Sequence, residues 1–431
     1  MNLQRTQPLR PARGRARAAA AVAVASALLL AGCGSDDDGS ADSAADSSAE
    51  SSSASGAATA SESPTATATP TEETPATLVP GGSTMDDTGR VLPGEAVFSV
   101  LSPWNTPATD LGVQQYSDEL LELAKQRLGV NNNGELERVT VDEGIFINTY
   151  AWTVPVVADG DPTVLHCRQV QCGDGKDDIT LNVPDDLSPL PQYDGWYTIF
   201  DQANGKAYDL WRARREDDGV LSYGFMRQWD LDGPGFNQPY VVSSRGSGLP
   251  LFGGLIRSGE LERGVINHAL AISVPGAASG NFVQPASSTN GNGAENSLPM
   301  GARIVLKSDF KLRQPIDPSN GRPLKMSADQ KRYARAVVKA LKTYGAFVVD
   351  RSAVPTLYYE RTADSFDDTN VNDRLLLGYE VRDIGLEDFQ VADFAPSDRI
   401  PYPSEEESVN SSDLEEQGPI LSEIPDTSGG Q

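Results

Sequence analysis

Short segments rich in β-branched and aromatic residues recur between turn residues, and this pattern most constrains the fold. Residues 196–201 form one such segment, and residues 207–212 form the next, after Asn204-Gly205. Asn-Gly between two β-rich segments is a strong signal for a hairpin. Many short strands joined by turns predict a mainly β domain, a β-sandwich or jelly-roll-like architecture with one or two packed α-helices.

Further β-rich segments lie on both sides of this hairpin. Strands are expected at residues 145–150, 153–157, 268–274 and 303–307. Two later segments, residues 346–350 and 356–360, flank Pro355. Their short separation predicts a second hairpin.

Two segments have the periodicity and the end signals of helices. Ser117 is expected to cap a helix over residues 118–128, which Gly129 would end. Ser327 and Gln330 have the spacing of a capping box, so a second helix is expected to begin there and to end before Gly345.

The N-terminal segment predicts where the protein is placed. Five arginines precede an apolar run at residues 18–30, which ends in Leu30-Ala31-Gly32-Cys33. The basic start, short apolar middle and small residues predict a signal peptide over residues 1–32. The ending resembles a bacterial lipobox, so Cys33 is the predicted lipidation (palmitate) site and the cell membrane the predicted location. The alternatives are an uncleaved anchor, for which the run is shorter than the roughly 18–20 residues that span a bilayer, and a secreted protein cut elsewhere.

Composition divides the rest of the chain into three parts. Residues 33–85 are rich in Ser, Thr, Ala and Pro with few large apolar residues, which predicts a disordered tether. Residues 86–394 have the composition of a single globular β-rich domain and hold all five tryptophans. Residues 395–431 are polar and acidic, which predicts a disordered tail.

The chain is strongly acidic, with a formal net charge of −26. Removal of residues 1–32, which contain five arginines and no acidic residue, makes the charge more negative still. A protein with this much negative charge repels the phosphate backbone of nucleic acids, and no nucleic-acid partner is therefore expected. The predicted partners are the membrane, through the lipid anchor, and a polysaccharide.

The three cysteines are Cys33, Cys167 and Cys172. Outside the cytosol, the close pair Cys167 and Cys172 predicts a disulfide across a tight loop. The rival interpretation is a metal site, for which only His166 lies beside the pair and about four ligands are needed. No metal site and no cofactor are therefore predicted.

A few residues are candidates for chemistry. His268 begins a predicted strand and is the candidate catalytic base, with a histidine satisfied by the protein's own groups as the alternative. Arg257 and Arg303 are candidates to bind a substrate carboxylate, or else to pair with the protein's acids. Trp211 is the candidate to stack on a sugar ring. Four acidic residues are weaker candidates for a hydrolytic pair: Asp209, Asp230, Asp232 and Glu262.

Several known motifs are missing from the sequence. There is no nucleotide loop and no His-Glu-x-x-His. Ser247, in the segment that runs from Ser243 to Gly248, is directly adjacent to a glycine on each side. A nucleophile elbow (Gly-x-Ser-x-Gly) needs one residue between the serine and each glycine.

A series of motifs resembles a large family of uncharacterised secreted bacterial proteins and lipoproteins. The motifs are GLPLFGGLIR at 248–257, NHAL at 267–270, GARIVLK at 301–307 and ALKTYGAFVVD at 340–350. The resemblance implies a secreted all-β domain with a role at the cell surface or on polysaccharide. The chain departs from the pattern in having Trp196 after Asp194-Gly195, where relatives tend to have histidine. A catalytic histidine pair would therefore be incomplete here.

Together these observations predict a lipid-anchored extracellular protein whose β-sandwich domain interacts with cell-envelope or environmental polysaccharide. The sequence favours neither a binding module nor an enzyme of lyase or hydrolase type. The alternative is a non-catalytic envelope or adhesion lipoprotein with protein partners.

Overall fold

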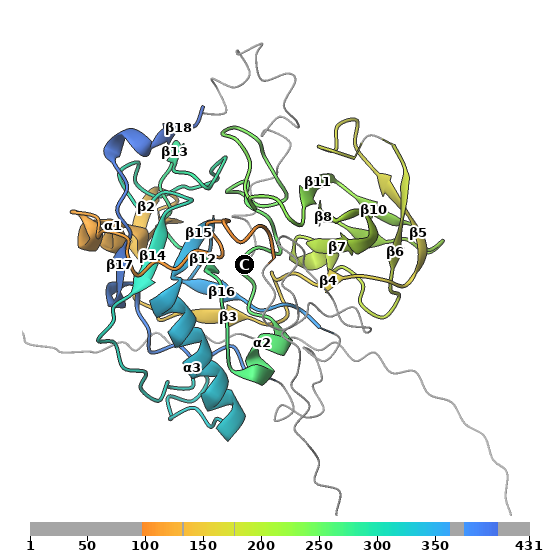
Figure 1. Ribbon diagram of the computed structural model, residues 1–431. Coiled ribbons are helices and arrows are strands. Elements are labelled where there is room, and N and C mark those ends of the chain that lie inside the picture. The colour runs from red at the N-terminus through yellow and green to blue at the C-terminus, as the bar shows by residue number, and fades with distance from the viewer. Residues whose placement is uncertain (1–96, 132, 176, 363–374, 404–431) are drawn as a thin grey trace, which may run out of the picture. The chain divides into compact units, whose positions relative to one another are not determined.

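The structure is a computed structural model that describes residues 97–131, 133–175, 177–362 and 375–403. The predicted signal peptide, the lipidation site Cys33 and the predicted tether lie outside the described residues. The described part is mainly β with three α-helices, so the predicted fold class is confirmed. Figure 1 shows its elements.

The largest sheet has six strands in the order β17-β14-β15-β12-β16-β3. Their bounds are β3 Phe146–Asn148, β12 Leu270–Val274, β14 Arg303–Leu306, β15 Ala346–Arg351, β16 Thr356–Tyr358 and β17 Phe389–Val391. The β12–β15 and β16–β3 pairs are parallel, whereas β14 pairs antiparallel with both neighbours. The sheet is therefore mixed and does not have the fully antiparallel order of a jelly roll.

Two further sheets have four strands each, in the orders β11-β8-β7-β4 (the middle sheet) and β6-β5-β10-β9 (the outer sheet). The middle strands are β4 Val156–Val157, β7 Tyr197–Asp201, β8 Lys206–Trp211 and β11 Phe225–Asp230. The outer strands are β5 Asp161–Cys167, β6 Ile179–Val183, β9 Arg214–Arg215 and β10 Leu221–Tyr223. Two-stranded pairs complete the set: β1 Gln126–Val130 with β2 Leu136–Thr140, and β13 Asn281–Phe282 with β18 Ile400–Pro401.

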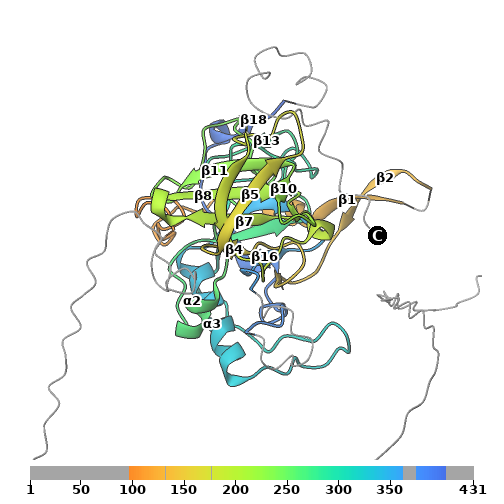
Figure 2. The ribbon, with the colours of Figure 1, turned by 90° about the vertical axis from the view of Figure 1, so that its right-hand side faces the viewer.

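The three large sheets are stacked, with one hydrophobic core between each neighbouring pair. Alternate residues of a strand therefore pack into different cores. In β15, Phe347 and Val349 pack in the core shared with the middle sheet, whereas Val348 packs in the core beneath the helices. In β7, Phe200 faces the first of these cores and Ile199 faces the outer sheet. This period-two alternation makes β7 and β15 buried on both faces. Figure 2, which looks from the side of the outer sheet, shows β5 across β7 and β8.

The helices cover the remaining face of the six-stranded sheet. They are α1 Ser117–Ala124, α2 Ser258–Arg263 and α3 Ala328–Thr343, and all three contribute to one core cluster. The predicted capping box of α3 is confirmed, because the Ser327 hydroxyl accepts from Gln330 N at 3.0 Å and the Gln330 side chain accepts from Ser327 N at 3.0 Å. Gly345, with φ 68°, follows this helix as expected.

The predicted helix over residues 118–128 is wrong in both its end and its cap. Helix α1 ends at Ala124, because Leu128 belongs to β1 and pairs with Arg138 of β2. Pairing with a neighbouring strand overrides the helical periodicity here. The Ser117 hydroxyl accepts from Val391 N at 2.9 Å and so anchors α1 to β17.

One predicted hairpin is confirmed and the other is wrong. Strands β7 and β8 pair antiparallel across Gly205, which has φ 63° as the turn requires. Strands β15 and β16 are both present, but β12 lies between them and pairs with each. Because β12 is buried along its whole length, it takes the central position that the two later strands would otherwise have shared.

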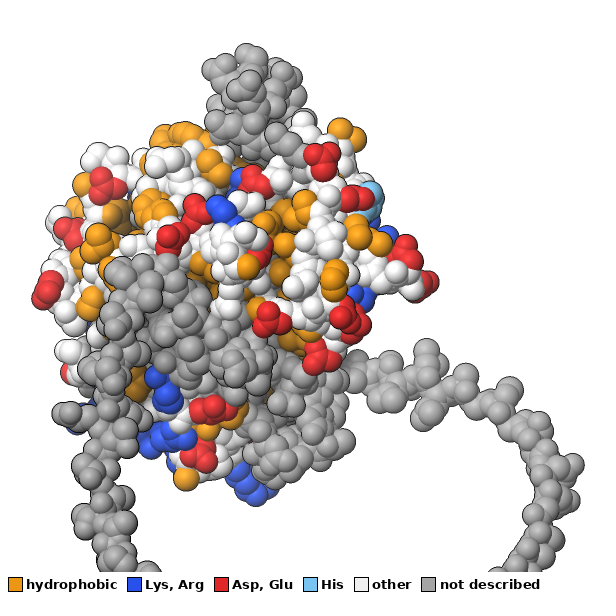
Figure 3. Space-filling model, turned by 45° about the vertical axis from the view of Figure 1, so that its right-hand side comes forward, with side chains coloured by type: hydrophobic (Ala, Val, Ile, Leu, Met, Phe, Trp, Pro, Cys, Tyr) orange, Lys and Arg blue, Asp and Glu red, His pale blue; other side chains and the backbone are white. Residues whose placement is uncertain are grey.

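The ordered chain continues past the predicted domain boundary at residue 394. Strand β18 pairs with β13, and Tyr402 lies 6.4 Å from the ring of Tyr240. Residues 404–431 of the predicted tail lie outside the described residues. No helix in the described part is long and apolar enough to cross a membrane. On the face drawn in Figure 3, acidic side chains are dispersed among hydrophobic ones, so the negative charge is not gathered there into one patch.

Candidate functional site

A pocket of about 520 Å³ opens where the middle sheet meets the six-stranded sheet. Its lining combines aromatic and ionisable side chains that are distant in the sequence. The aromatic members include Trp152, Trp196, Trp211 and Tyr358, and the ionisable ones include Asp194, Arg245 and Asp350. Such a combination of apolar walls with a few convergent polar groups is typical of a ligand site.

Asp194 is held in the pocket by a tight turn. It follows the 3-10 helix η1 (Pro191–Tyr193) in the left-handed conformation, with φ 64°. Gly195 also has positive φ, and a Cβ there would lie 2.6 Å from the carbonyl oxygen of Ala213. Arg212 N donates to the carbonyl of Asp194 at 2.9 Å. Aspartate tolerates this conformation better than most residues, so the Asp-Gly pair suits the turn.

Asp350 enters the same pocket from β15 and is buried. Its Oδ1 accepts hydrogen bonds from Asn290 Nδ2 at 3.0 Å and from Arg351 N at 2.8 Å. These two donors favour the ionised carboxylate. Asp350 therefore has the means to hold a negative charge inside the domain.

Arg245 supplies a buried positive charge beside the acids. Its guanidinium donates to the carbonyls of Pro250 and Leu251 at 3.3 and 3.2 Å. It lies 4.9 Å from the ring centre of Tyr358 and 5.6 Å from that of Trp196. Its Nε has no hydrogen-bond partner among the described residues. A buried donor without a protein partner is free to donate a hydrogen bond to a ligand acceptor that enters the pocket.

The two acids differ in their electrostatic surroundings. Burial, together with the charge of Asp350, raises the pKa of Asp194 to about 6, and Arg212 opposes this rise. Burial also raises the pKa of Asp350, but the hydrogen bond from Asn290 and the charge of Arg245 oppose it. After burial, the charge of Asp350 is the second cause of the raised pKa of Asp194, whereas the donors around Asp350 favour its ionised form. Environments that separate two acids in this way can assign an acid and a base.

Backbone strain concentrates around the pocket. Trp152, Asp194 and Arg212 have φ values of 48°, 64° and 53°. Arg212 follows Trp211, and its guanidinium lies 4.2 Å from the centre of the Trp211 ring. Residues held at positive φ are costly and cluster at functional sites.

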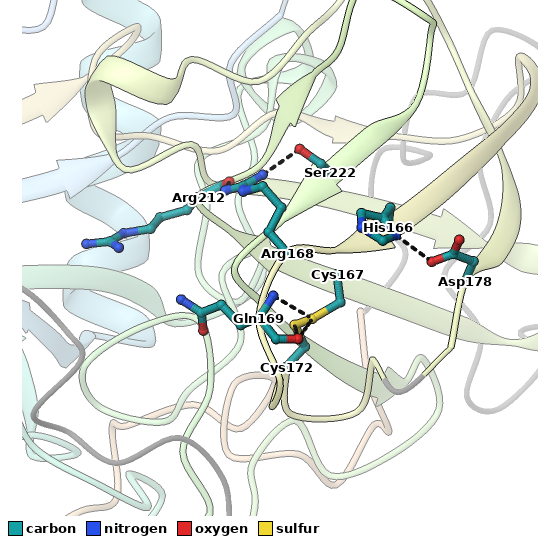
Figure 4. Close-up of a disulfide and its surroundings, with 8 residues drawn as sticks. All are labelled: His166, Cys167, Arg168, Gln169, Cys172, Asp178, Arg212 and Ser222. Atoms are coloured by element: carbon teal, nitrogen blue, oxygen red, sulfur yellow. Dashed lines mark hydrogen bonds and ion pairs between the residues drawn. A yellow bond between two sulfur atoms is a disulfide. The ribbon is translucent and has the colours of Figure 1, made fainter.

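A disulfide closes the loop that contains Gln169, one of the residues that line the pocket (Figure 4). The predicted Cys167–Cys172 bond is present, with the two Cα atoms 6.2 Å apart, so the metal-site interpretation of this pair is wrong. Inside the closed loop, Gln169 lines the pocket, and Arg168 donates to Ser222 Oγ and to the carbonyl of Arg212, both at 2.5 Å. His166 instead lies 2.8 Å from Asp178. The described residues contain no group of three or more His, Cys, Asp or Glu side chains that could hold a metal ion.

Of the four predicted site residues, Trp211 lines the pocket and the other three do not. Arg257 and His268 meet at the carboxylate of Glu260 instead, and the three residues form the α2 cluster. His268 Nε2 lies 3.0 Å and Arg257 Nη1 lies 3.4 Å from Glu260 Oε1. His268 Nδ1 is 2.9 Å from the carbonyl of Ala269. Burial raises the pKa of Glu260, but the interactions with His268 and Arg257 outweigh it and leave the pKa below its ordinary value.

Arg303 lies in a third place. Its Nε donates to the carbonyl of Tyr344 at 2.7 Å, its Nη2 donates to the carbonyl of Thr106, and its guanidinium packs over Phe347. Burial lowers its pKa to about 10. Arg303 thus joins the end of α3 to the N-terminal loop of the domain. The four predicted residues do not share one cleft.

The acids proposed for a hydrolytic pair are also placed elsewhere. Asp209 is fully buried and accepts from Thr198 Oγ1 at 2.5 Å, Trp229 Nε1 at 2.9 Å and Leu251 N at 2.7 Å. Burial raises its pKa to about 7, against these hydrogen bonds. Asp230 pairs with Lys206 at the surface. None of the four predicted acids, Asp232 and Glu262 included, lines the pocket.

The pocket residues Asp194, Arg245 and Asp350 were not among the predicted site residues. Each nevertheless lies in a segment that stood out in the sequence: Asp194-Gly195-Trp196, the Ser243–Gly248 loop, and the end of ALKTYGAFVVD. The sequence signals that could have found the two acids are the glycine that follows Asp194 and the position of Asp350 at the end of a buried strand.

Comparison with known proteins gives no further assignment: no protein-family model, no curated protein and no solved structure matches this chain. The resemblance to secreted bacterial proteins therefore stays a prediction.

Proposed function

We propose that this domain binds a polysaccharide in the tryptophan-lined pocket and hydrolyses a glycosidic bond there. The observation that carries the proposal is the pair Asp194 and Asp350, in which one acid has its pKa raised to about 6 beside the other. Two carboxyl groups in different protonation states are the usual requirement for glycoside hydrolysis.

The proposed roles follow from the surroundings of each group. Asp194 protonates the leaving oxygen of the glycosidic bond, because its pKa of about 6 keeps it protonated at mildly acidic pH, where an ordinary aspartate is ionised. Asp350, charged and fixed by Asn290 and Arg351 N, acts on the other side of the bond as base or nucleophile. Trp211, which is half-buried and lines the pocket, provides a flat apolar face for the sugar.

We also propose that the protein is a lipoprotein held on the outer face of the cell membrane through Cys33. Support comes from the basic and apolar N-terminal segment with its Leu-Ala-Gly-Cys ending. The Cys167–Cys172 disulfide adds support, because such bonds persist in oxidising compartments. A Cys33→Ala variant is expected to lose incorporation of labelled palmitate in a bacterial host, and equal labelling of this variant would contradict the anchor.

Hydrolysis is tested by the release of reducing ends from a panel of soluble polymers: a β-glucan, a xylan, a galacturonan, an alginate and solubilised peptidoglycan. The wild-type protein is expected to cleave at least one of them. Asp194→Asn and Asp350→Asn are expected to lose that activity, whereas Asp230→Asn, which changes a surface acid outside the pocket, is expected to keep it. Cleavage that survives both pocket substitutions would overturn the assignment.

Binding is tested separately on a glycan array. Trp211→Ala is expected to lose the signal of the wild-type protein, since it removes one wall of the pocket. Binding without any cleavage would reduce the proposal to a binding module. No glycan signal at high protein concentration would instead favour an adhesion lipoprotein with protein partners.

A further inference from the structure

Trp152 is exposed although its large apolar ring would ordinarily be covered. It is 52% exposed, and no other tryptophan in the described part of the chain appears among the exposed large hydrophobic residues. It also lines the pocket that contains Asp194 and Asp350. An exposed aromatic side chain at the rim of a pocket is a favourable contact for a ligand that extends beyond it.

The backbone that presents Trp152 is fixed on both sides. Its φ of 48° is in the left-handed region, which is costly for a tryptophan. Asn148 Nδ2 donates to the carbonyl of Trp152 at 3.2 Å, and Thr153 Oγ1 donates to the carbonyl of Tyr359 at 2.5 Å. These contacts tie the loop to β3 and to the residue that follows β16. The domain thus maintains a strained conformation that leaves the ring in solvent.

The ring is also connected to the proposed acid. Trp152 packs on Tyr193 with ring centres 4.9 Å apart and an interplanar angle of 59°. Tyr150 packs on the edge of the same tyrosine, with ring centres 6.1 Å apart. Tyr193 directly precedes Asp194 in the chain. The aromatic rim formed by Tyr150, Trp152 and Tyr193 is therefore next to the acid.

We infer that Trp152 forms a further sugar subsite at the rim, so that the substrate is a glycan chain whose two units on either side of the cleaved bond occupy the pocket while the next unit stacks on Trp152. The inference rests on the proposed function and specifies the substrate as an extended chain. A disaccharide held in the pocket would have no use for a strained, exposed tryptophan at the rim. A chain would cover the ring and gain stacking energy without further reorganisation of the loop.

The test compares chain lengths on one set of variants. Oligosaccharides of two to six units are prepared from whichever panel polymer the wild-type protein cleaves, and KM is measured for each. For the wild-type protein, KM is expected to fall with length. Trp152→Ala is expected to raise KM for the longest oligomer about fivefold to tenfold and to leave KM for the disaccharide unchanged. Trp152→Phe is expected to restore part of the difference.

Two controls make the outcomes separable. Tyr116, which is 57% exposed and outside the pocket, gives the matched variant Tyr116→Ala, and its KM values should equal those of the wild-type protein. Thermal unfolding of each variant shows that it is folded. If KM does not depend on length, or if Trp152→Ala affects the shortest and longest oligomers equally, the rim subsite is wrong while hydrolysis stands. If no polymer is cleaved or bound, the proposed function itself fails.

Discussion

The α2 cluster and the pocket are two groups of buried charges in one domain, and they are constructed differently. In the α2 cluster, Glu260 lies between the side chains of Arg257 and His268, and the pKa of Glu260 is lowered below its ordinary value. In the pocket, two acids lie near each other and the pKa of both is raised.

This difference distinguishes a structural cluster from a functional one. Oppositely charged partners stabilise each other in the folded state, so the α2 cluster needs nothing from outside the domain. Two acids with raised pKa destabilise the folded state at neutral pH, and such a cost persists where it serves a function. Burial of ionisable groups is common to the α2 cluster and the pocket, so burial alone does not distinguish a structural cluster from a functional one.

The largest effect expected is on catalysis by the pocket. Asp194→Asn removes the acidic proton, and the rate of polymer cleavage should fall about 10²- to 10⁴-fold. Glu260→Gln, which alters the α2 cluster instead, should leave the rate of the folded protein within about a factor of two, since its side chain does not line the pocket. Initial rates of reducing-end release measure both effects. An equal loss of rate in both variants would contradict the assignment of catalysis to the pocket.

The next effect is on stability at the α2 cluster. Glu260→Ala leaves Arg257 and His268 buried without their common carboxylate, and the free energy of unfolding should fall by about 3–5 kcal/mol. Urea denaturation at pH 7 measures it. A change below about 1 kcal/mol would mean that this buried pairing contributes little to folding.

Substitution of an acid in the pocket should raise the free energy of unfolding, whereas substitution of Glu260 should lower it. The folded-state pKa of Asp194, about 6, lies above the ordinary value of 3.8. The folded protein therefore binds this proton more tightly than the unfolded chain, and stability falls as pH rises from about 4 to 6. Asp194→Asn removes that loss and should raise stability at pH 7 by about 1–3 kcal/mol. Denaturation curves at pH 4 and pH 7 should show the gain only at the higher pH.

The smallest effect tests the role predicted for His268. His268→Gln keeps a side chain able to donate to Glu260, so stability should fall by only about 1 kcal/mol. The sequence-based prediction of a catalytic base requires loss of cleavage in this variant. The contacts of His268 with Glu260 and Ala269 instead predict cleavage at the wild-type rate. Rate measurements on the folded variant separate the two roles.

Local features of the fold were predictable from the sequence, whereas contacts between distant segments were not. The capping box of Ser327 and the Asn204-Gly205 turn depend on neighbouring residues, and both are present. The position of β12 between β15 and β16 depends on pairing across long stretches of chain, which periodicity does not report.

The same limit applies to the site. Trp211 was predictable as an aromatic candidate in a β-rich region, and it lines the pocket. Asp194 and Asp350 lie far apart in the sequence, and only the packing of the middle sheet against β15 brings them together. Arg303 was a reasonable candidate by residue type, but its donors bind backbone carbonyls, a pairing that no spacing in the sequence reveals.

The account depends on burial and the charge of Asp350 together raising the pKa of Asp194. Carbon-13 NMR titration of the Asp194 carboxyl carbon measures this without a substrate. The pKa of Asp194 is expected near 6 in the wild-type protein and lower in Asp350→Asn, where the neighbouring charge is gone. A wild-type pKa close to 4, unchanged in Asp350→Asn, would contradict the account.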